Sequence, residues 1–182
     1  MPHSNIIDAQ SEDEIWKKIA EQLETKDNTL DYTAQFMTGD KSVTLDIDID
    51  PNRSADSDKP VTTFTTPLTD EVGFRFRIEK QGLKHTIGKL FGMQDVIVGQ
   101  PEFDKKFLIR SNDVEKVKQL FSDPAISATL LDEPVADFEI REHRIGANRE
   151  IILGLDLDGV ITDPQKLQQL FQPFKMVLSQ LQ

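Results

Sequence analysis

The sequence predicts an α+β fold, in which helices pack on one face of a mostly antiparallel sheet of about six to eight strands. Two observations lead to this fold class. Several segments alternate apolar and polar residues with a period of two, which is typical of strands that have one buried and one wet face. Helical segments with an apolar stripe are interspersed among these hairpin-joined strands, with one near the N-terminus and a long one at the C-terminus.

Length and composition favour one domain over residues 1–182, with residues 1–10 as a loose N-terminal tail. Hydrophobic residues make up 37% of the chain and include 11 Phe, which can supply a core. Cysteine is absent, which excludes disulfides, thiolate zinc sites and a cysteine nucleophile. The acidic start lacks signal-peptide features, and no apolar run approaches the roughly 20 residues of a membrane helix. We therefore expect a protein of the bacterial cytoplasm without a membrane span.

The net charge of −11 argues against binding to nucleic acid or to an anionic membrane, because both need clustered positive charge. The charge is unevenly distributed. Residues 1–71 carry 6 basic and 16 acidic side chains, residues 72–118 carry 10 and 6, and residues 119–182 carry 5 and 10. The middle of the chain is therefore a basic island, which we expect the acidic flanks to complement within the fold.

The N-terminal half predicts one helix followed by four strands. Ser11 and Glu14 form a capping-box pattern, and residues 12–24 then place their apolar side chains on one helical face. Alternation predicts strands over residues 32–36, 43–49, 61–68 and 74–78. A Thr-Gly-Asp turn joins the first two strands, and the polar, proline-bounded residues 51–60 are expected to form an exposed loop.

The C-terminal half predicts further helices and strands. Residues 80–93 indicate a short helical or irregular segment that its glycines weaken. Asp123-Pro124 is expected to open a short helix, and Asp163-Pro164 the last helix, whose apolar stripe is continuous. Two more strands, over residues 135–140 and 149–158, are joined by a polar turn.

Residues 92–121 specify structure more densely than any other segment. They combine a short apolar strand, a Gly-Pro turn, two Phe residues and a second strand. Asn112 and Glu115 then form a capping-box pattern at the start of a helix. Asp104 is expected to cap the turn at Pro101-Glu102, or to pair with Lys105 or Arg110. We interpret this segment as a folding nucleus and assign its aromatic side chains to the core.

The same segment resembles an uncharacterised bacterial family known only as a domain of unknown function. The pattern consists of a Phe-Asp-x-x-Phe motif at Phe103, Asp104 and Phe107, then an apolar strand, then a polar break that ends at Asn112-Asp113 before a helix. The resemblance implies an α+β fold and no known activity, and it brings no catalytic residue or cofactor.

The segment 151–163 resembles the first motif of haloacid dehalogenase-like phosphatases, an apolar strand followed by Asp-x-Asp-Gly. The resemblance implies Asp156 as a nucleophile and Asp158 as a general acid/base, working with magnesium. In that family the remaining site residues lie on strands far downstream, whereas here only 24 residues follow Asp158. We therefore prefer a strand that ends in an Asp-Gly turn before a capped helix.

Three carboxylates, Asp46, Asp48 and Asp50, share one side of a predicted strand, about 7 Å apart. They could hold a divalent cation only if other oxygens joined them, and the glycine and glutamate of a calcium loop are missing. We expect a solvated strand face, paired across strands with Arg75 and Arg77.

The remaining candidates do not form a catalytic motif. The three histidines are scattered, and the glycines form neither a dinucleotide fingerprint nor a phosphate loop. The best candidates for an anion or an acidic partner are Lys84, His85, Lys89, Lys105 and Lys106.

We therefore predict a non-catalytic binding or protein-interaction domain of the cytosol, without cofactor or metal, that acts through a protein partner or as a homo-oligomer. Two alternatives stay open. One is an apolar-ligand binder or enzyme with a pocket between sheet and helices. The more remote one is a metal-dependent phosphohydrolase that uses Asp156 and Asp158.

Overall fold

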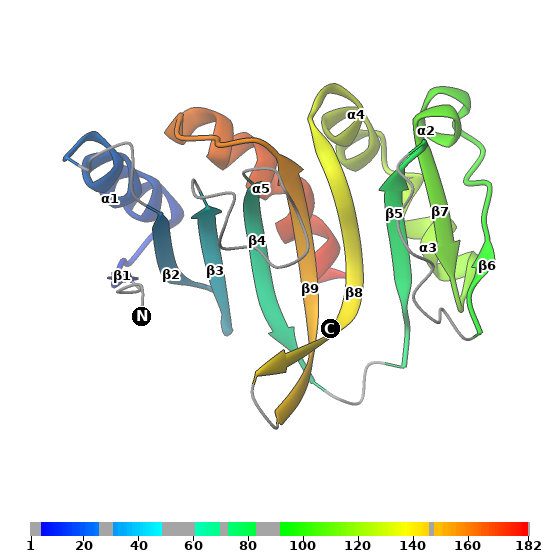
Figure 1. Ribbon diagram of the computed structural model, residues 1–182, viewed down its shortest axis with the longest axis horizontal. Coiled ribbons are helices and arrows are strands. Elements are labelled where there is room, and N and C mark those ends of the chain that lie inside the picture. Colours follow the sequence, from blue (N-terminus) through cyan, green and yellow to red (C-terminus); the bar gives the residue numbers. More distant parts are fainter. Residues whose placement is uncertain are drawn as a thin grey trace.

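The computed structural model describes residues 5–25, 31–48, 61–69, 73–82, 92–145 and 148–181. Within these residues the chain forms a nine-stranded sheet and five helices, and Figure 1 shows the helices on one side of the sheet. The predicted α+β class, with N-terminal and long C-terminal helices, is confirmed, and the sheet has one strand more than the largest number expected. The predicted loop at residues 51–60 lies outside the described residues.

The strands are β1 (Asn5–Ile7), β2 (Tyr32–Thr38), β3 (Lys41–Asp48), β4 (Val61–Leu68), β5 (Phe76–Lys80), β6 (Gln94–Asp95), β7 (Phe107–Ser111), β8 (Val135–Ile145) and β9 (Asn148–Asp158). The helices are α1 (Glu12–Thr25), α2 (Pro101–Lys106), α3 (Val114–Phe121), α4 (Pro124–Asp132) and α5 (Pro164–Ser179). Along the sheet the strand order is β1-β2-β3-β4-β9-β8-β5-β7-β6, and only the β1–β2 pair is parallel.

The C-terminal hairpin β8–β9 lies in the middle of the sheet. β9 pairs with β4 and β8 pairs with β5, so the hairpin joins the N-terminal strands to the β5–β7–β6 group. Its alternating pattern explains this position. Phe138, Ile140, Leu153 and Leu155 are buried in the core, while charged residues occupy the alternate positions on β8. Both groups of strands therefore share one core.

Aspartate side chains cap the starts of α3, α4 and α5, as the sequence predicted for α4 and α5. The carboxylate of Asp123 accepts the Ala125 N–H at 2.9 Å, and that of Asp163 accepts the Gln165 N–H at 2.9 Å. At α3 the cap is Asp113 instead of the predicted Asn112, because the Asp113 carboxylate accepts the Lys116 N–H at 3.0 Å.

Asn112 has a different role from the predicted cap. Its side-chain oxygen accepts the Arg75 N–H at 2.7 Å, and its amide donates to the Gly73 carbonyl at 2.8 Å. The side chain therefore ties the loop before α3 to the segment before β5.

Two elements were not anticipated. Residues 5–7, within the expected tail, form the edge strand β1, and the Phe-Asp-x-x-Phe motif begins inside the short helix α2. Asp104 caps a turn, although not the one expected at Pro101-Glu102, which lies inside α2: its carboxylate accepts the N–H groups of Val98 and Gly99 at 2.9 Å each. Gly99 has a φ of 91°, which favours glycine at this turn.

Aromatic rings fill the space between the sheet and the helices. Phe171 on α5 lies 5.5 Å from Phe36 and 5.6 Å from Phe64, measured between ring centroids, and Trp16 of α1 lies 5.6 Å from it. Phe138 and Phe174 connect this group to a second one around α2 and α3, which includes Phe103 and Phe107. The aromatics of residues 92–121 that the structure describes belong to the core, as predicted.

Candidate functional site

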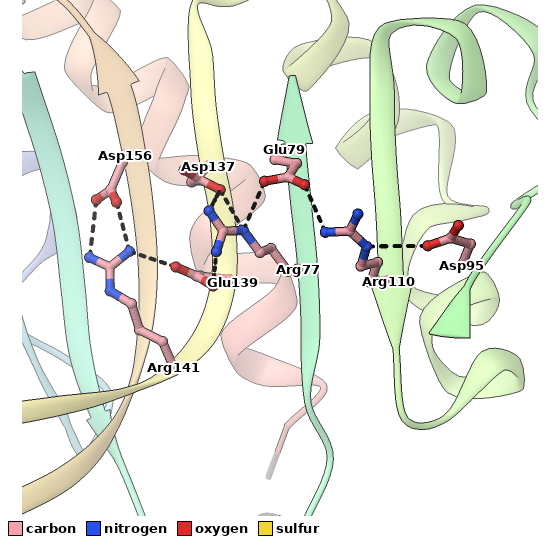
Figure 2. Close-up of polar contacts among 8 residues, drawn as sticks. All are labelled: Arg77, Glu79, Asp95, Arg110, Asp137, Glu139, Arg141 and Asp156. Atoms are coloured by element: carbon pink, nitrogen blue, oxygen red, sulfur yellow. Dashed lines mark hydrogen bonds and ion pairs between the residues drawn. The ribbon is translucent and has the colours of Figure 1, made fainter. Parts of the chain in front are cut away.

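The sheet face opposite the helices, here called the open face, carries one connected set of charged side chains. We call this set the charged ladder (Figure 2). Its members are Arg77 and Glu79 on β5, Asp95 on β6, Arg110 on β7, Asp137, Glu139 and Arg141 on β8, and Asp156 on β9. Because side chains alternate between faces along each strand, the strands that bury Phe76, Ile78, Phe138 and Leu155 toward the helices direct the ladder residues the other way.

Arg77 is the centre of the ladder. Its Nε lies 3.0 Å from Asp137 Oδ1 and 3.2 Å from Glu79 Oε2, and its Nη1 lies 3.7 Å from Glu139 Oε2. These three carboxylate residues are only 7–9% exposed although no described helix covers them. Burial by itself lowers the pKa of Arg77, but the nearby charges of Glu139, Asp137 and Glu79 more than offset this effect and raise it. Arg77 therefore stays charged and neutralises its neighbours.

Arg141 extends the ladder to β9. Its Nη1 lies 2.6 Å from Asp156 Oδ2 and 3.2 Å from Glu139 Oε1, and its Nη2 lies 3.3 Å from Asp156 Oδ1. This is a two-pronged guanidinium–carboxylate pair. Burial lowers the pKa of Arg141, whereas Asp156 and then Glu139 raise it, and the result lies above the ordinary value.

Arg110 connects the ladder to the sheet edge. Its Nη1 lies 2.9 Å from Glu79 Oε1, and its Nε lies 3.2 Å from Asp95 Oδ1. The Asp95 side chain is 75% exposed, in contrast to 10% for Glu79. The ladder is therefore well shielded at its centre and open to solvent at β6.

The ladder holds its charged groups in fixed positions. Its five carboxylates outnumber its three guanidinium groups, which leaves a surplus of two negative charges. Each guanidinium contacts at least two carboxylates, and these contacts fix the position of the guanidinium group. Among the residues that the structure describes, no three His, Cys, Asp or Glu side chains converge as metal ligands would.

The five lysine and histidine candidates are only partly visible. Lys84, His85 and Lys89 lie outside the described residues. Lys105 is exposed on α2. Lys105 and Lys106, with Glu102, Leu131 and Asp132, line an open hollow of about 480 Å³ between α2 and α4. An anion-binding role for this set stays a prediction.

Lys106 has a structural role at the end of α4. Its Nζ donates to the carbonyl oxygens of Leu130 at 3.3 Å, Leu131 at 2.5 Å and Glu133 at 2.9 Å. These carbonyls lie at the end of the helix, where no following helical turn supplies N–H donors for them. Burial lowers the pKa of Lys106, and the positive charge of Lys80 lowers it further. Its three N–H donors are thus used within the fold.

The predicted pairing of the Asp46 strand with Arg75 and Arg77 is wrong. β4, β9 and β8 separate β3 from β5, so these side chains are far apart in the sheet. Asp46 does lie on the open face, where Thr33 on β2 donates to it, and Asp50 lies outside the described residues.

The segment around Asp156 has the form that we preferred from the sequence. β9 ends at Asp158, Gly159 turns with a φ of 97°, and Asp163 caps α5. Asp156 is held by Arg141, and the phosphohydrolase alternative stays a prediction. No helix formed by the described residues is both long and apolar enough to cross a membrane.

Sequence reasoning did not find the ladder. A signal was present, because Arg77 and Glu79 on one segment, and Asp137, Glu139 and Arg141 on another, alternate with core residues at a period of two. What the sequence lacked was the adjacency of the two segments, since Arg77 and Asp137 are 60 positions apart.

Comparison with known proteins gives a fold and no family. No family model and no curated protein matches the sequence. The chain is similar to the crystal structure of the mycobacterial trehalose monomycolate transport factor A, TtfA, with a TM-score of 0.53 over 92% of each chain and 9% sequence identity. This likeness shows a shared fold, and at such an identity it transfers no residue role.

Proposed function

We propose that this chain is a non-catalytic binding domain that docks a protein partner on the open face of its sheet. The observation that carries the proposal is the charged ladder, which connects eight charged side chains from five strands on a face that no described helix covers. The opposite face, by contrast, is used by the core.

An ordered set of charges suits recognition for two physical reasons. Side chains that are already held in place lose little rotamer freedom when a partner docks, which lowers the entropic cost of association. A fixed pattern of positive and negative groups also favours a complementary partner and disfavours others. The shared fold gives further support, because the similar mycobacterial protein bears the name of a transport factor and not of an enzyme.

The test places bulky charged side chains on the open face. Thr63→Arg/Thr65→Arg adds two arginines on β4 beside β9, where Thr63 pairs with Asp156 and Thr65 with Gly154. Ala125→Arg/Ala128→Arg adds the same charge at two exposed positions of α4 and is the matched control. Both variants are first checked for a wild-type circular dichroism spectrum and melting temperature.

Wild-type, open-face and control proteins are then used for affinity capture from an extract of the source cells, with quantitative mass spectrometry. For proteins that both wild type and control enrich, we expect the recovered amount to fall at least tenfold with Thr63→Arg/Thr65→Arg. Equal enrichment by all three would contradict docking on the open face.

A second candidate is binding of an apolar ligand between the sheet and the helices. The observation that favours it is the likeness to a protein named for the transport of trehalose monomycolate. The rings of Phe64, Phe171 and Phe174 lie in that space, with centroids 5.6–6.0 Å apart, and a ligand would have to displace them. Titration with a fluorescent fatty acid separates the two candidates. Saturable binding of the fatty acid that Phe171→Trp abolishes would favour the ligand binder. We expect no saturable binding.

A further inference from the structure

The outer edge of the sheet at β6 presents backbone groups that nothing in the described part of the chain uses. Asp95 pairs with Arg110 of β7, and the Val96 N–H donates to the Ile109 carbonyl at 2.9 Å. In an antiparallel pair, alternate residues direct both backbone groups toward the neighbouring strand. Since Val96 faces β7, the N–H and C=O groups of Asp95 and Ile97 point away from the sheet, where a further strand would lie.

The side chains at this edge are exposed as well. The Asp95 side chain is 75% exposed and Ile97 is 71% exposed, whereas Val96 between them is 4% exposed. Asp95 and Ile97 therefore share one side of the segment, the side of the open face. Only one oxygen of the Asp95 carboxylate contacts Arg110, at 3.2 Å, so the other can accept a further charged partner. The edge offers an apolar side chain and a carboxylate two residues apart.

The length of this edge is limited. The Asp104 carboxylate takes the N–H groups of Val98 and Gly99, and Gly99 turns the chain with a φ of 91°. Residues 94–97 are therefore the stretch that an added strand could follow. An occupant would be a short extended segment, and a complete long strand would run past the edge.

We propose that the β6 edge is a β-augmentation site that takes a short extended segment of a partner protein as a tenth strand. The segment pairs antiparallel to residues 94–97, with an apolar side chain beside Ile97 and, two residues later, a lysine or arginine beside Asp95. This proposal rests on the proposed binding function and names the partner as a peptide segment with that pattern.

A second copy of this chain fits the edge less well. If two copies paired antiparallel about Val96, Asp95 of one would face Ile97 of the other, which places a carboxylate against an apolar side chain twice. If they paired about Asp95, two carboxylates would face each other, and like charges directly opposite are destabilising. Charge complementarity therefore selects a partner with a cation.

The test uses the full chain, labelled with ¹⁵N, and the synthetic peptide acetyl-Thr-Val-Thr-Lys-Thr-amide as probe. Ile97→Pro removes the outward N–H of residue 97 at an edge position where proline is tolerated, so the fold should be kept. A peptide N-methylated at its valine and lysine lacks the matching donors but has the same side chains. Asp95→Lys, with a peptide that has glutamate in place of lysine, exchanges the charges.

We expect amide shift changes confined to residues 94–98 and the adjoining part of β7. Binding should weaken at least tenfold with the N-methylated peptide and with Ile97→Pro. Asp95→Lys should weaken binding of the lysine peptide, and the glutamate peptide should bind to this variant with restored affinity.

Three outcomes would overturn the proposal: equal binding of the methylated peptide, amide shift changes elsewhere in the chain, or no shift changes at about 5 mM peptide. That concentration detects contacts worth only about 3 kcal/mol. Dimerisation of wild type that Ile97→Pro abolishes would also overturn the proposal, because the occupant would then be a second copy. If the edge fails while Thr63→Arg/Thr65→Arg still loses its partner, the open face remains the docking surface.

Discussion

The guanidinium of Arg141 lies flat against Gly154, with its Cζ 3.1 Å and both terminal nitrogens 3.2 Å from the point that a Cβ at residue 154 would occupy. Gly154 stands inside β9, where glycine is unfavourable unless another group must approach the backbone closely. Here the close group is the side chain that reaches Asp156 at 2.6 Å. Gly154 is therefore part of the charged ladder although it carries no charge.

Gly154→Val should destabilise the fold by about 1–3 kcal/mol, because its side chain displaces the Arg141 guanidinium from Asp156. In an Arg141→Gln background the same substitution should cost clearly less, since the obstructing group is gone. Urea denaturation of the four proteins of this double-mutant cycle measures the coupling. Additive effects of the two substitutions would show that the contact has no energetic consequence.

Arg77→Gln should lower the free energy of unfolding at pH 7 by about 2–4 kcal/mol, since three shielded carboxylates lose the cation that they share, although Arg110 still pairs with Glu79 and Arg141 with Glu139. Arg144→Gln is the control, because the Arg144 side chain is 67% exposed and pairs with an exposed Glu142. Its effect should stay within about 0.5 kcal/mol. A similar loss in both variants would contradict a central role for Arg77.

Asp156→Asn tests the ladder and the phosphohydrolase alternative together. The change keeps an oxygen near Arg141 but removes its charge, so we expect a loss of about 1–2 kcal/mol in the free energy of unfolding. The wild-type protein should not hydrolyse p-nitrophenyl phosphate with magnesium. A magnesium-dependent activity of wild type that disappears in Asp156→Asn would instead support the phosphohydrolase.

Lys105 and Lys106 offer a pair of neighbouring lysines with different surroundings. Lys106→Met should cost about 1–2 kcal/mol of stability, because the carbonyls at the end of α4 lose their donor. Lys105→Met should be nearly neutral, since Lys105 is exposed. Chemical denaturation of both variants is the measurement. Equal stability of the two would show that the Lys106 contacts contribute little.

Local patterns predicted most of the elements, and long-range pairing explains what they missed. The period-two alternation found β3 and β4, and the Asp-Pro pairs at Asp123 and Asp163 marked the starts of α4 and α5. The six residues of α2 are too few for a helical period to be visible. Strand order was beyond reach, because it depends on contacts between segments such as β5 and β8 that are far apart in the sequence.

The same limit explains the error at the candidate site. The sequence correctly placed carboxylates and arginines on a wet strand face, but it paired Arg77 with Asp46 on β3. In the fold, the inserted β8–β9 hairpin supplies Asp137 and Glu139 instead. Charge alternation along a strand thus indicates which face a side chain occupies, and the neighbouring strand decides its partner.

Glu12 and Lys175 join the first and last helices, and their contact makes a prediction about pH. The Glu12 carboxylate accepts from Lys175 and from Gln172, the latter at 2.7 Å. Burial by itself raises the pKa of Glu12, but these hydrogen bonds and the Lys175 charge outweigh it and hold the pKa below its ordinary value of 4.5. A carboxylate with a lowered pKa in the folded state adds stability above its unfolded pKa and loses it as the pH falls through the folded pKa.

Glu12→Gln should therefore reduce stability at pH 7, and the reduction should be smaller at about pH 3. The reduction should stay within about 1 kcal/mol, because the Lys175 side chain is 42% exposed and solvent screens the pair. Urea denaturation at the two pH values is the measurement, with Glu21→Gln as the control, since Glu21 is exposed on the same helix. A deficit that is as large at pH 3 as at pH 7 would mean that the α1–α5 contact depends on the shape of the Glu12 side chain and not on its charge.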